Sequence, residues 1–311
     1  PSAVFYVDKA SGSDSSDGTS WENAFKTLQK GIDAAESGAT SSKPHELWVA
    51  AATYDENRYS ASNPSGALQM KPYVNLLGGF KKGDTAKSQR DWNNNKTYID
   101  GSKARNGQAA FHVVMSAQAG LDGFIIRGGR ANGTSGNDSC GGGLLLSSGG
   151  VKLGNNTFTD NTAKLKGGAI CCLNPTSPPI ISSCTFDANH ADTGAGGAIA
   201  VEGGASQTYI LQSTFTENTA AYGGSIDFMN ANAAASMISQ VTFSENQAKT
   251  DLGGAITATN STLTIDGSTF FHNGAPNNGG AISCSGGSIT ATNSSFTSNY
   301  GSNSGGAIAG S

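Results

Sequence analysis

Residues 158–170 read FTDNTAKLKGGAI, and this stretch decides the fold because close copies of it recur to the end of the chain. Its first half is an F-x-x-N motif, which occurs six times, at Phe158, Phe186, Phe215, Phe243, Phe270 and Phe296. Successive phenylalanines are 28, 29, 28, 27 and 26 residues apart. A fixed period of about 20–50 residues is typical of a repeat architecture.

The second half of the stretch is a G-G-[AS]-I motif with the same period. It begins at Gly167, Gly196, Gly223, Gly253, Gly279 and Gly305, and a weaker GGLL copy begins at Gly142. Between each glycine pair and the next phenylalanine lie short β-rich runs, such as residues 179–186 and 262–270. No run has helical spacing over three turns, which argues against leucine-rich repeats and helical solenoids.

The pattern predicts an all-β solenoid of short parallel strands, in which one repeat makes one coil and coils stack about 4.8 Å apart. Stacking should place the phenylalanines in a buried column. The asparagines should form a ladder, with each amide bonded to the next and to turn backbone. The glycine pairs should lie where the chain turns with positive φ or approaches a neighbouring coil, with Ala and Ile pointing inward. We therefore expect these recurrent residues to be structural.

The paired motifs resemble the repeats of right-handed parallel β-helix proteins, and most of all the passenger repeats of chlamydial-type polymorphic outer-membrane proteins. The resemblance covers roughly residues 140–311. It implies a right-handed parallel β-helix that is displayed at a cell surface or secreted, as in autotransporter-like passengers. It implies little about chemistry, because the motifs serve packing.

Residues 1–60 are not repeat-like. We predict strands at 4–7 and 47–54, and between them an amphipathic helix whose apolar face comprises Phe25, Leu28, Ile32 and Ala35. The blocks FYVD, GTSW and AFKTLQ in this segment are similar to the N-terminal cap of many secreted β-helix proteins. We expect residues 1–60 to cap the open end of the solenoid and residues 61–311 to form the β-helix, with regular repeats from about residue 140.

Arg90, Asp91 and Trp92 fall in a long loop between two predicted strands. Long loops often carry binding sites; the favoured alternative is a loop folded back over a coil edge, with Arg90 paired to a carboxylate. The chain stops inside a repeat at Ser311, so we expect the natural protein to continue into further C-terminal domains.

Charge is unevenly distributed along this chain of net charge −4. Residues 1–166 hold 18 of the 19 Lys and Arg, whereas residues 167–311 hold only Lys249 against eight acidic residues. The acidic repeats disfavour nucleic acid and anionic membranes as partners. No apolar run approaches the roughly 20 residues of a membrane span.

Five cysteines are present. Cys140, Cys171, Cys172 and Cys184 should lie in two neighbouring coils. The favoured interpretation is small buried thiols, and the alternative is one disulfide among these four.

Enzymes with this fold need clustered functional groups on the outer coil faces. A polysaccharide lyase needs an Arg or Lys base, and residues 167–311 contain one Lys and no Arg. A hydrolase needs paired carboxylates. Glu217 and Glu245 should lie on adjacent coils and could share a proton or bind calcium, but the same position then holds His272 and Ser298. We assign no catalytic, cofactor-binding or metal-binding residue.

The sequence therefore favours a non-enzymatic cell-surface or secreted β-helix that acts as an adhesin, stalk or passenger domain, with an extracellular glycan or protein as its partner. The alternative is a carbohydrate-active enzyme, a hydrolase or lyase on a pectate-lyase-like β-helix, with its site before residue 167. An ice-binding or mineral-binding face would need a regular Thr-x-Thr array, and the threonines are scattered.

Overall fold

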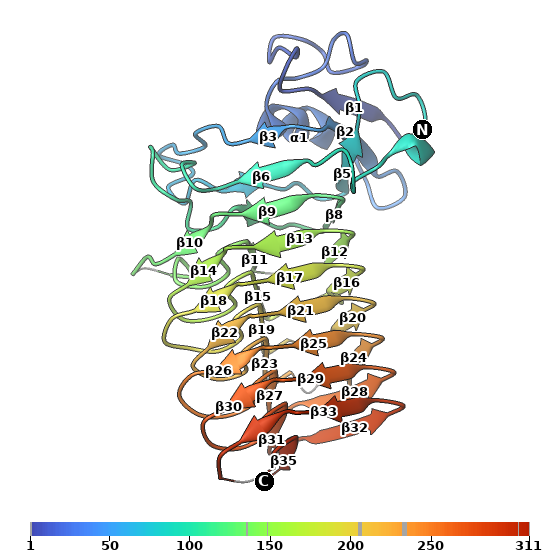
Figure 1. Cartoon of the computed structure of the whole chain (residues 1–311). Coiled ribbons are helices and arrows are strands. Elements are labelled where there is room, and N and C mark those ends of the chain that lie inside the picture. Colours follow the sequence, from blue (N-terminus) through green and yellow to red (C-terminus); the bar gives the residue numbers. More distant parts are fainter. Residues whose placement is uncertain are drawn as a thin grey trace.

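The computed structural model describes residues 2–134, 136–147, 149–204, 207–231, 235–303 and 305–310. The chain winds as a right-handed parallel β-helix, in which four parallel sheets run along the length of the rod (Figure 1). The fold class predicted from the repeats is confirmed.

Two of the sheets meet at the corner before each F-x-x-N motif. Sheet 1 has ten strands: β1 (Val4–Val7), β2 (His45–Ala50), β5 (Val74–Phe80), β8 (Ala119–Asp122), β12 (Val151–Gly154), β16 (Ile180–Ser182), β20 (Tyr209–Leu211), β24 (Ser236–Ser239), β28 (Thr262–Asp266) and β32 (Ser288–Thr292). Sheet 2 has nine: β3 (Thr53–Tyr54), β6 (Tyr98–Asp100), β9 (Ile125–Arg127), β13 (Thr157–Thr159), β17 (Thr185–Asp187), β21 (Thr214–Thr216), β25 (Thr242–Ser244), β29 (Thr269–Phe271) and β33 (Ser295–Thr297).

The other two sheets meet at the corner that carries the glycine pairs. Sheet 3 has seven strands: β10 (Arg130–Ala131), β14 (Thr162–Ala163), β18 (His190–Ala191), β22 (Thr219–Ala220), β26 (Gln247–Ala248), β30 (Gly274–Ala275) and β34 (Tyr300–Gly301). Sheet 4 has nine: β4 (Leu68–Gln69), β7 (Val114–Met115), β11 (Leu144–Leu146), β15 (Ile170–Leu173), β19 (Ile199–Glu202), β23 (Ile226–Met229), β27 (Ile256–Thr259), β31 (Ile282–Ser285) and β35 (Ile308–Gly310).

The phenylalanines form the predicted column inside the rod. Their strands pair so that each Phe lies directly above the next, as Phe158 does above Phe186. Ring centroids of neighbours are 4.5–5.1 Å apart and ring planes differ by 5–15°. All but Phe296, in the last coil, are fully buried. Offset stacking of this kind adds to the free energy gained by burying the rings.

The asparagine ladder is confirmed as well, and Asn218 illustrates it. Its Nδ2 donates to the Phe186 carbonyl oxygen (2.9 Å) and to Asn246 Oδ1 (3.0 Å). Its Oδ1 accepts from the backbone N (3.0 Å) and Nδ2 (3.1 Å) of Asn189. The amide thus uses both donors and both lone pairs while fully buried. Because every amide satisfies the next, the ladder removes the cost of burying polar groups.

The two glycines of each pair have different structural roles. The first is a left-handed corner residue, with φ of 68° at Gly196. The second lies against the next coil: a Cβ on Gly197 would be 2.2 Å from the Gly224 carbonyl oxygen, so no larger residue fits. The following Ala198 and Ile199 are fully buried inside the rod, as predicted.

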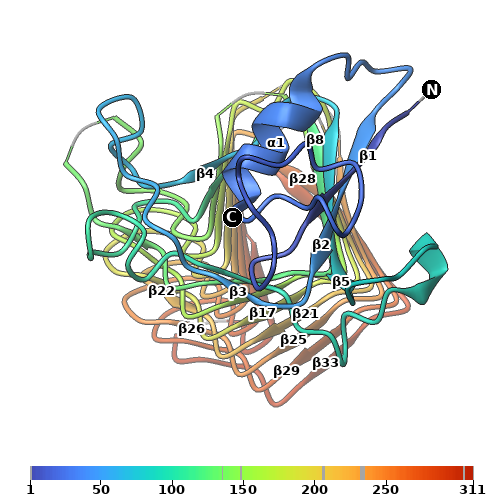
Figure 2. The same ribbon diagram turned by 90° about the horizontal axis from the view of Figure 1, so that it is seen from above.

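Helix α1 (Leu28–Glu36) lies across the N-terminal end of the coils (Figure 2). Leu28, Ile32 and Ala35 are its buried face, and Thr27 caps it by accepting from the Lys30 backbone N. The cap helix is therefore confirmed. Phe25 is buried but precedes the helix, because its backbone pairs with β1 instead. β1 and β2 already belong to sheet 1, and the domain division at residue 60 stays a prediction.

Several predicted strands are in fact two strands joined by a corner. The run at 47–54 is divided between β2 and β3, the run at 179–186 turns at Ser183 (φ 54°), and the run at 262–270 turns at Gly267 (φ 58°). Ser183 occupies a left-handed conformation that is unusual for a residue with a Cβ, so this corner could not be predicted from the residue type. Among the described residues no helix combines the length and apolar character needed to cross a membrane.

Candidate functional site

Glu217 and Glu245 lie at the corner between sheets 2 and 3. Both have left-handed backbones, with φ of 54° and 58°, and both are exposed. The Glu217 backbone N bonds the Ser244 carbonyl oxygen (3.2 Å) of the next coil, so the two residues are neighbours along the rod. No group of three or more metal-binding side chains occurs among the described residues. That this pair serves neither catalysis nor calcium binding stays a prediction.

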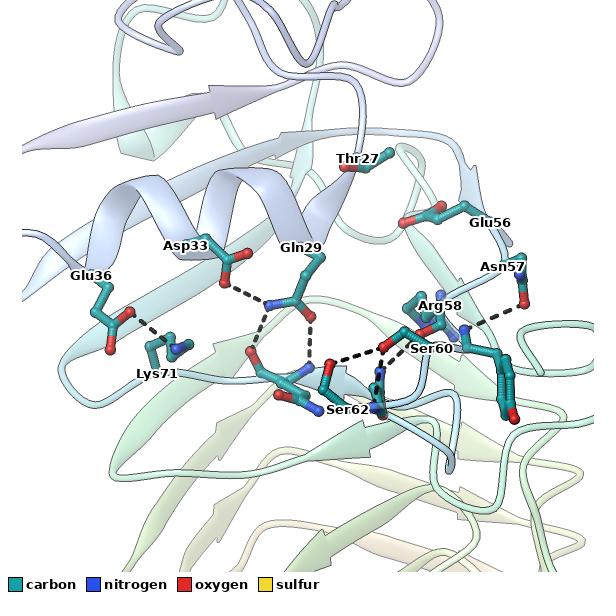
Figure 3. Close-up of a pocket in the computed structure, with 13 residues that line it drawn as sticks. Thr27, Gln29, Asp33, Glu36, Glu56, Asn57, Arg58, Ser60, Ser62 and Lys71 are labelled. Carbon is teal, nitrogen blue, oxygen red and sulfur yellow. Dashed lines mark hydrogen bonds and ion pairs between the residues drawn. The ribbon is translucent and has the colours of Figure 1, made fainter. Parts of the chain in front are cut away.

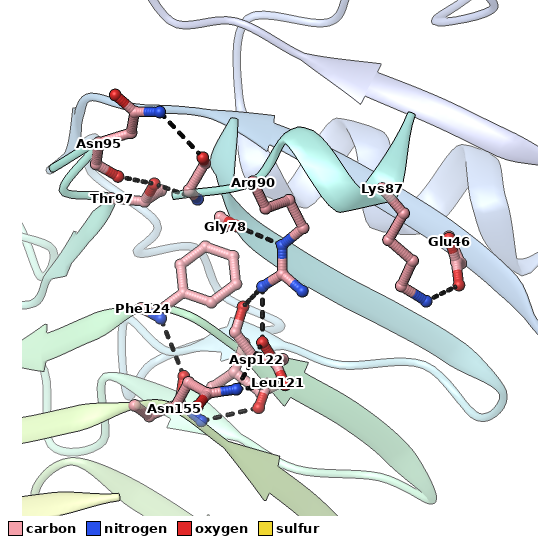
Figure 4. Close-up of polar contacts among 12 residues, drawn as sticks. Glu46, Gly78, Lys87, Arg90, Asn95, Thr97, Leu121, Asp122, Phe124 and Asn155 are labelled. Carbon is pink, nitrogen blue, oxygen red and sulfur yellow. Dashed lines mark hydrogen bonds and ion pairs between the residues drawn. The ribbon is translucent and has the colours of Figure 1, made fainter. Parts of the chain in front are cut away.

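The loop of Arg90 folds back onto sheet 1, as the favoured interpretation expects (Figure 4). The Arg90 guanidinium donates to Asp122 Oδ1 (2.6 Å), to the Asp122 carbonyl oxygen (2.9 Å) and to the Gly78 carbonyl oxygen (2.7 Å). It also lies against the rings of Phe80 and Trp92. Through Nε and Nη2, Arg90 thus fixes the loop that contains the short 3-10 helix η1 (Lys87–Gln89).

A groove opens on the outer face of sheet 1, beside this loop. Its two lobes have volumes of about 370 Å³ and 320 Å³ and share Asn75, Lys152 and Ile180. The groove exists because glycines replace side chains that would stand on the outer face. A Cβ on Gly120 would be 2.7 Å from Asn75 Oδ1, and one on Gly154 would be 2.4 Å from Asp122 Oδ2.

The groove combines apolar and polar surface. Lys152 and Ile180 are register partners on β12 and β16, and Tyr73 and Gln118 line the same lobe. The Tyr73 hydroxyl donates to Gln118 Oε1 (3.3 Å). Within the described chain, the Asn75 amide and the exposed Lys152 ammonium have no hydrogen-bonding partner, so both can bind a ligand. We name this surface, defined by these five residues and Gly120, the sheet 1 groove.

A larger pocket of about 560 Å³ lies between α1 and the segment at 56–63 (Figure 3). Most of its lining is already paired. Gln29 Nε2 donates to Asp33 Oδ1 (2.9 Å) and to the Gln69 carbonyl oxygen (3.1 Å), and Lys71 forms an ion pair with Glu36 (3.0 Å). The pocket therefore offers few free groups to a ligand.

Two side-chain atoms that line the pocket between α1 and the segment at 56–63 are not paired in this way. Arg58 Nη1 and Glu56 Oε1 are buried and have no hydrogen-bonding partner among the residues that the structure describes. The rest of the Arg58 guanidinium bonds the carbonyl oxygens of Gly66 (3.2 Å) and Asp100 (3.3 Å), which ties the cap to the early coils. Burial lowers the pKa of Arg58, and the nearby Glu56 carboxylate opposes that shift.

Sequence reasoning predicted neither the sheet 1 groove nor the pocket beside α1. The available signal for the sheet 1 groove was glycine inside β-rich segments, at Gly120 and Gly154, since a strand glycine often marks a place where another group approaches closely. The pairing of distant segments such as β5, β8 and β12 could not be read from one-dimensional spacing, because the early coils lack a constant period.

Comparisons with known proteins agree with the repeat analysis. The family model for the Chlamydia polymorphic membrane protein repeat matches residues 157–173, 240–259 and 267–285. A curated relative, the metabotropic glutamate receptor-like protein R of Dictyostelium discoideum, is 40% identical over 76 residues. That match covers 24% of this chain and only 5% of the relative's length.

Two crystal structures of the pectin methylesterase of Aspergillus niger resemble the whole chain at low identity. The deglycosylated form has a TM-score of 0.46 and 13% identity, covering 96% of this chain and 84% of the enzyme. The penultimately deglycosylated form has a TM-score of 0.42 and 12% identity, covering 100% and 86%. The chain is a right-handed parallel β-helix whose G-G-A-I and F-x-x-N repeats are similar to the Chlamydia polymorphic membrane protein repeat.

Proposed function

We propose that this chain is a non-enzymatic, surface-displayed or secreted β-helix that works as an adhesin, stalk or passenger domain. One observation carries the proposal: the side chains that recur from coil to coil point inward and bind the coils together. The outward corner position changes freely, from Asp160 to Ala188, Glu217, Glu245, His272 and Ser298. A repeat that keeps its interior and varies its exterior builds length rather than a repeated active site.

The construction suits a rigid spacer. Ten stacked strands at a spacing of about 4.8 Å give a rod about 45 Å long. The Phe column and the Asn ladder fill the interior of the regular coils, so bending the rod would break buried contacts. The likeness to a polymorphic membrane protein repeat supports a place at a cell surface.

The sheet 1 groove is the surface that we propose for the partner, an extracellular glycan. Its volume falls in the usual range of about 300–1,000 Å³ for ligand sites. The unpaired Asn75 amide and Lys152 ammonium can bond sugar hydroxyl or carboxylate groups. Ile180 and Tyr73 offer apolar surface for the C–H face of a sugar ring.

Binding of the fluorescently labelled chain to an immobilised panel of extracellular polysaccharides tests this proposal. We expect saturable binding that the double variant Asn75→Ala, Lys152→Ala weakens by about tenfold, because two hydrogen-bonding groups are lost. The matched control, Asn93→Ala with Lys249→Ala, changes the same residue types at exposed positions outside the groove and should bind like the parent.

The same samples test the competing enzyme hypothesis through the release of reducing ends and of methanol. We expect neither product above the heat-denatured control. Catalytic turnover that the groove variant abolishes would overturn the non-enzymatic proposal. Equal glycan binding by the parent, the groove variant and the matched control would show that the groove is not the binding surface.

A further inference from the structure

Outside sheet 4 a short ladder covers part of the sheet's outer face. Cys140, Lys166, Ala195 and Tyr222 are joined by parallel bridges from coil to coil, and we call them the outer ladder. Beneath it lies the outward row of sheet 4, in which Leu145, Cys171, Ala200 and Asp227 are register partners on successive strands. The space between ladder and sheet is therefore a second interior, separate from the core of the rod.

Two cysteines face each other across this space. Cys140, Leu145, Cys171 and Ala200 form one buried cluster that is distinct from the main core. Each of the two thiols shifts the pKa of the other. The backbone agrees with this proximity, since a Cβ on Gly141, next to Cys140, would lie 3.1 Å from Cys171 Cβ.

The remaining cysteines are placed differently. Cys172 and Cys184 are fully buried in the main core, on different walls of the rod. Burial alone raises the pKa of Cys172 to about 12. Cys284 lies several coils further along, on β31. The disulfide that the sequence allowed among four cysteines is thus narrowed by the structure to one pair.

The two facing thiols differ in reactivity. Cys140 is 8% exposed, and the neighbouring Cys171 thiol lowers the pKa of Cys140 to about 7, helped by Ser139 and by the charge of Lys166. Cys171 is fully buried, and its pKa is raised by the Cys140 sulfur and by burial. A thiolate is the nucleophile in disulfide exchange, so Cys140 is the residue that an external reagent meets first.

We propose that Cys140 and Cys171 are a redox-active pair that closes to a disulfide in an oxidising compartment, with a small-molecule disulfide as the oxidant. The Cys140 thiolate attacks one sulfur of the oxidant, forming a mixed disulfide and releasing the first thiolate. Cys171 then loses its proton and attacks the Cys140 sulfur, which expels the second thiolate. Two protein thiols are oxidised to one disulfide, and the oxidant is reduced to two thiols.

The bond would fasten the outer ladder to sheet 4 where the regular repeats begin. It joins Cys140 to a residue 31 positions later and so closes a loop of about one coil. Such a crosslink restricts the unfolded chain and raises stability. Lys166 Nζ already binds Glu202 Oε2 (2.6 Å) over the same space, so the disulfide would add a covalent link to an existing polar one.

Treatment of the full chain with excess glutathione disulfide, followed by intact mass measurement and peptide mapping, tests the proposal. We expect the parent and the matched control Cys172→Ser to lose two hydrogen masses and to yield a linked peptide containing Cys140 and Cys171. The thermal midpoint should rise by several degrees and fall again after reduction. Cys171→Ser should stop at a glutathione adduct on Cys140, and Cys140→Ser should yield no crosslink.

Three results would overturn the proposal: a stable glutathione adduct on Cys140 of the parent, a crosslink between other cysteines, or five thiols that remain unmodified. Alkylation of the untreated parent provides a measurement that is independent of any variant. Cys140 should react before Cys171, Cys172 and Cys184, and faster labelling of any of these three would contradict the assigned order.

Discussion

The coils from Phe158 onward repeat one set of interior contacts, whereas the coils before residue 140 are held by contacts that occur once. In the later region the Phe column and the Asn ladder pass unchanged through every coil. In the early region Arg90 binds Asp122, Arg127 binds Asp100 (2.8 Å), and Arg58 bonds backbone carbonyl oxygens. Both regions share the hydrophobic core of the rod, but the polar contacts between coils are repeated in the later region and are made by single arginines in the early one.

This difference explains where surface features are found. Identical coils leave little room for long loops, because each coil must match the next. In the early coils each loop is held by its own contacts, so loops can differ. The pocket beside α1 lies entirely in this region, and the sheet 1 groove begins there and extends to Lys152 and Ile180. Four variants, from the largest expected effect to the smallest, test this contrast between shared and single contacts.

Replacement of Phe215 in the middle of the column should have the largest effect. Phe215→Ala removes a ring that stacks on both neighbours, with centroids 4.5 Å and 5.0 Å away, and should lower the free energy of unfolding by about 3–5 kcal/mol. Urea unfolding measures the loss. The control Phe271→Ala removes a ring that is 37% exposed and should cost about 1 kcal/mol or less. Equal losses would mean that the column is not the main support.

Replacement of one ladder amide should come next. Asn218→Ala removes the acceptor of the Asn189 backbone N and of one Asn189 Nδ2 hydrogen, and the donor to the Phe186 carbonyl oxygen, at a cost of roughly 3 kcal/mol. The exposed Asn93→Ala is the control and should be nearly neutral. If urea unfolding gives the two variants the same midpoint, the ladder does not stabilise the coils.

The early region should depend on single arginines. Arg90→Ala leaves Asp122 without its ion pair and frees the loop, and it should cost about 2 kcal/mol because Asp122 remains partly exposed. Limited proteolysis should then cleave first within residues 81–95. Arg130→Ala, at an exposed position, should change neither stability nor the cleavage pattern, and similar behaviour of both variants would contradict a single-contact region.

The smallest effect should be a pH dependence that originates at Asp227. Burial raises the pKa of this carboxyl to about 6, above its ordinary value of 3.8, although Thr257 Oγ1 donates to Oδ1 (2.6 Å). The folded state therefore holds the proton more tightly, so this contribution to stability is full below about pH 4 and is lost as the pH rises through 6.

Asp227→Asn should remove this loss. The variant should match the parent at pH 4 and exceed its free energy of unfolding at pH 8 by about 2 kcal/mol or less. Thermal unfolding at both pH values measures the difference. The exposed Asp160→Asn should follow the parent at each pH, and a variant of Asp227 that is less stable at pH 8 would show that the carboxylate is needed.

The sequence predicted the regular coils in detail and the early coils only in outline. The roles of Phe158, Asn161 and their equivalents can be predicted because every later coil repeats them, and the structure confirms the Phe column and the Asn ladder. Corners without glycine, such as Ser183, were missed because backbone conformation there is imposed by the neighbouring coils. The sequence alone allows several cysteine pairings and does not single out the Cys140–Cys171 contact, because the position of the outer ladder over sheet 4 is a tertiary property.

The central claim is that each repeat is one lap of a single solenoid, and removal of one whole lap tests it most directly. Deletion of residues 187–215 joins Phe186 of β17 to Thr216 of β21, which takes the place of its register partner Asp187, and keeps the Phe column and the Asn ladder in register. Deletion of 187–200 shifts them by half a lap. We expect cooperative urea unfolding, with a β-rich circular dichroism spectrum, for the whole-lap deletion and its loss for the half-lap deletion. Equal disruption by both deletions would contradict the account.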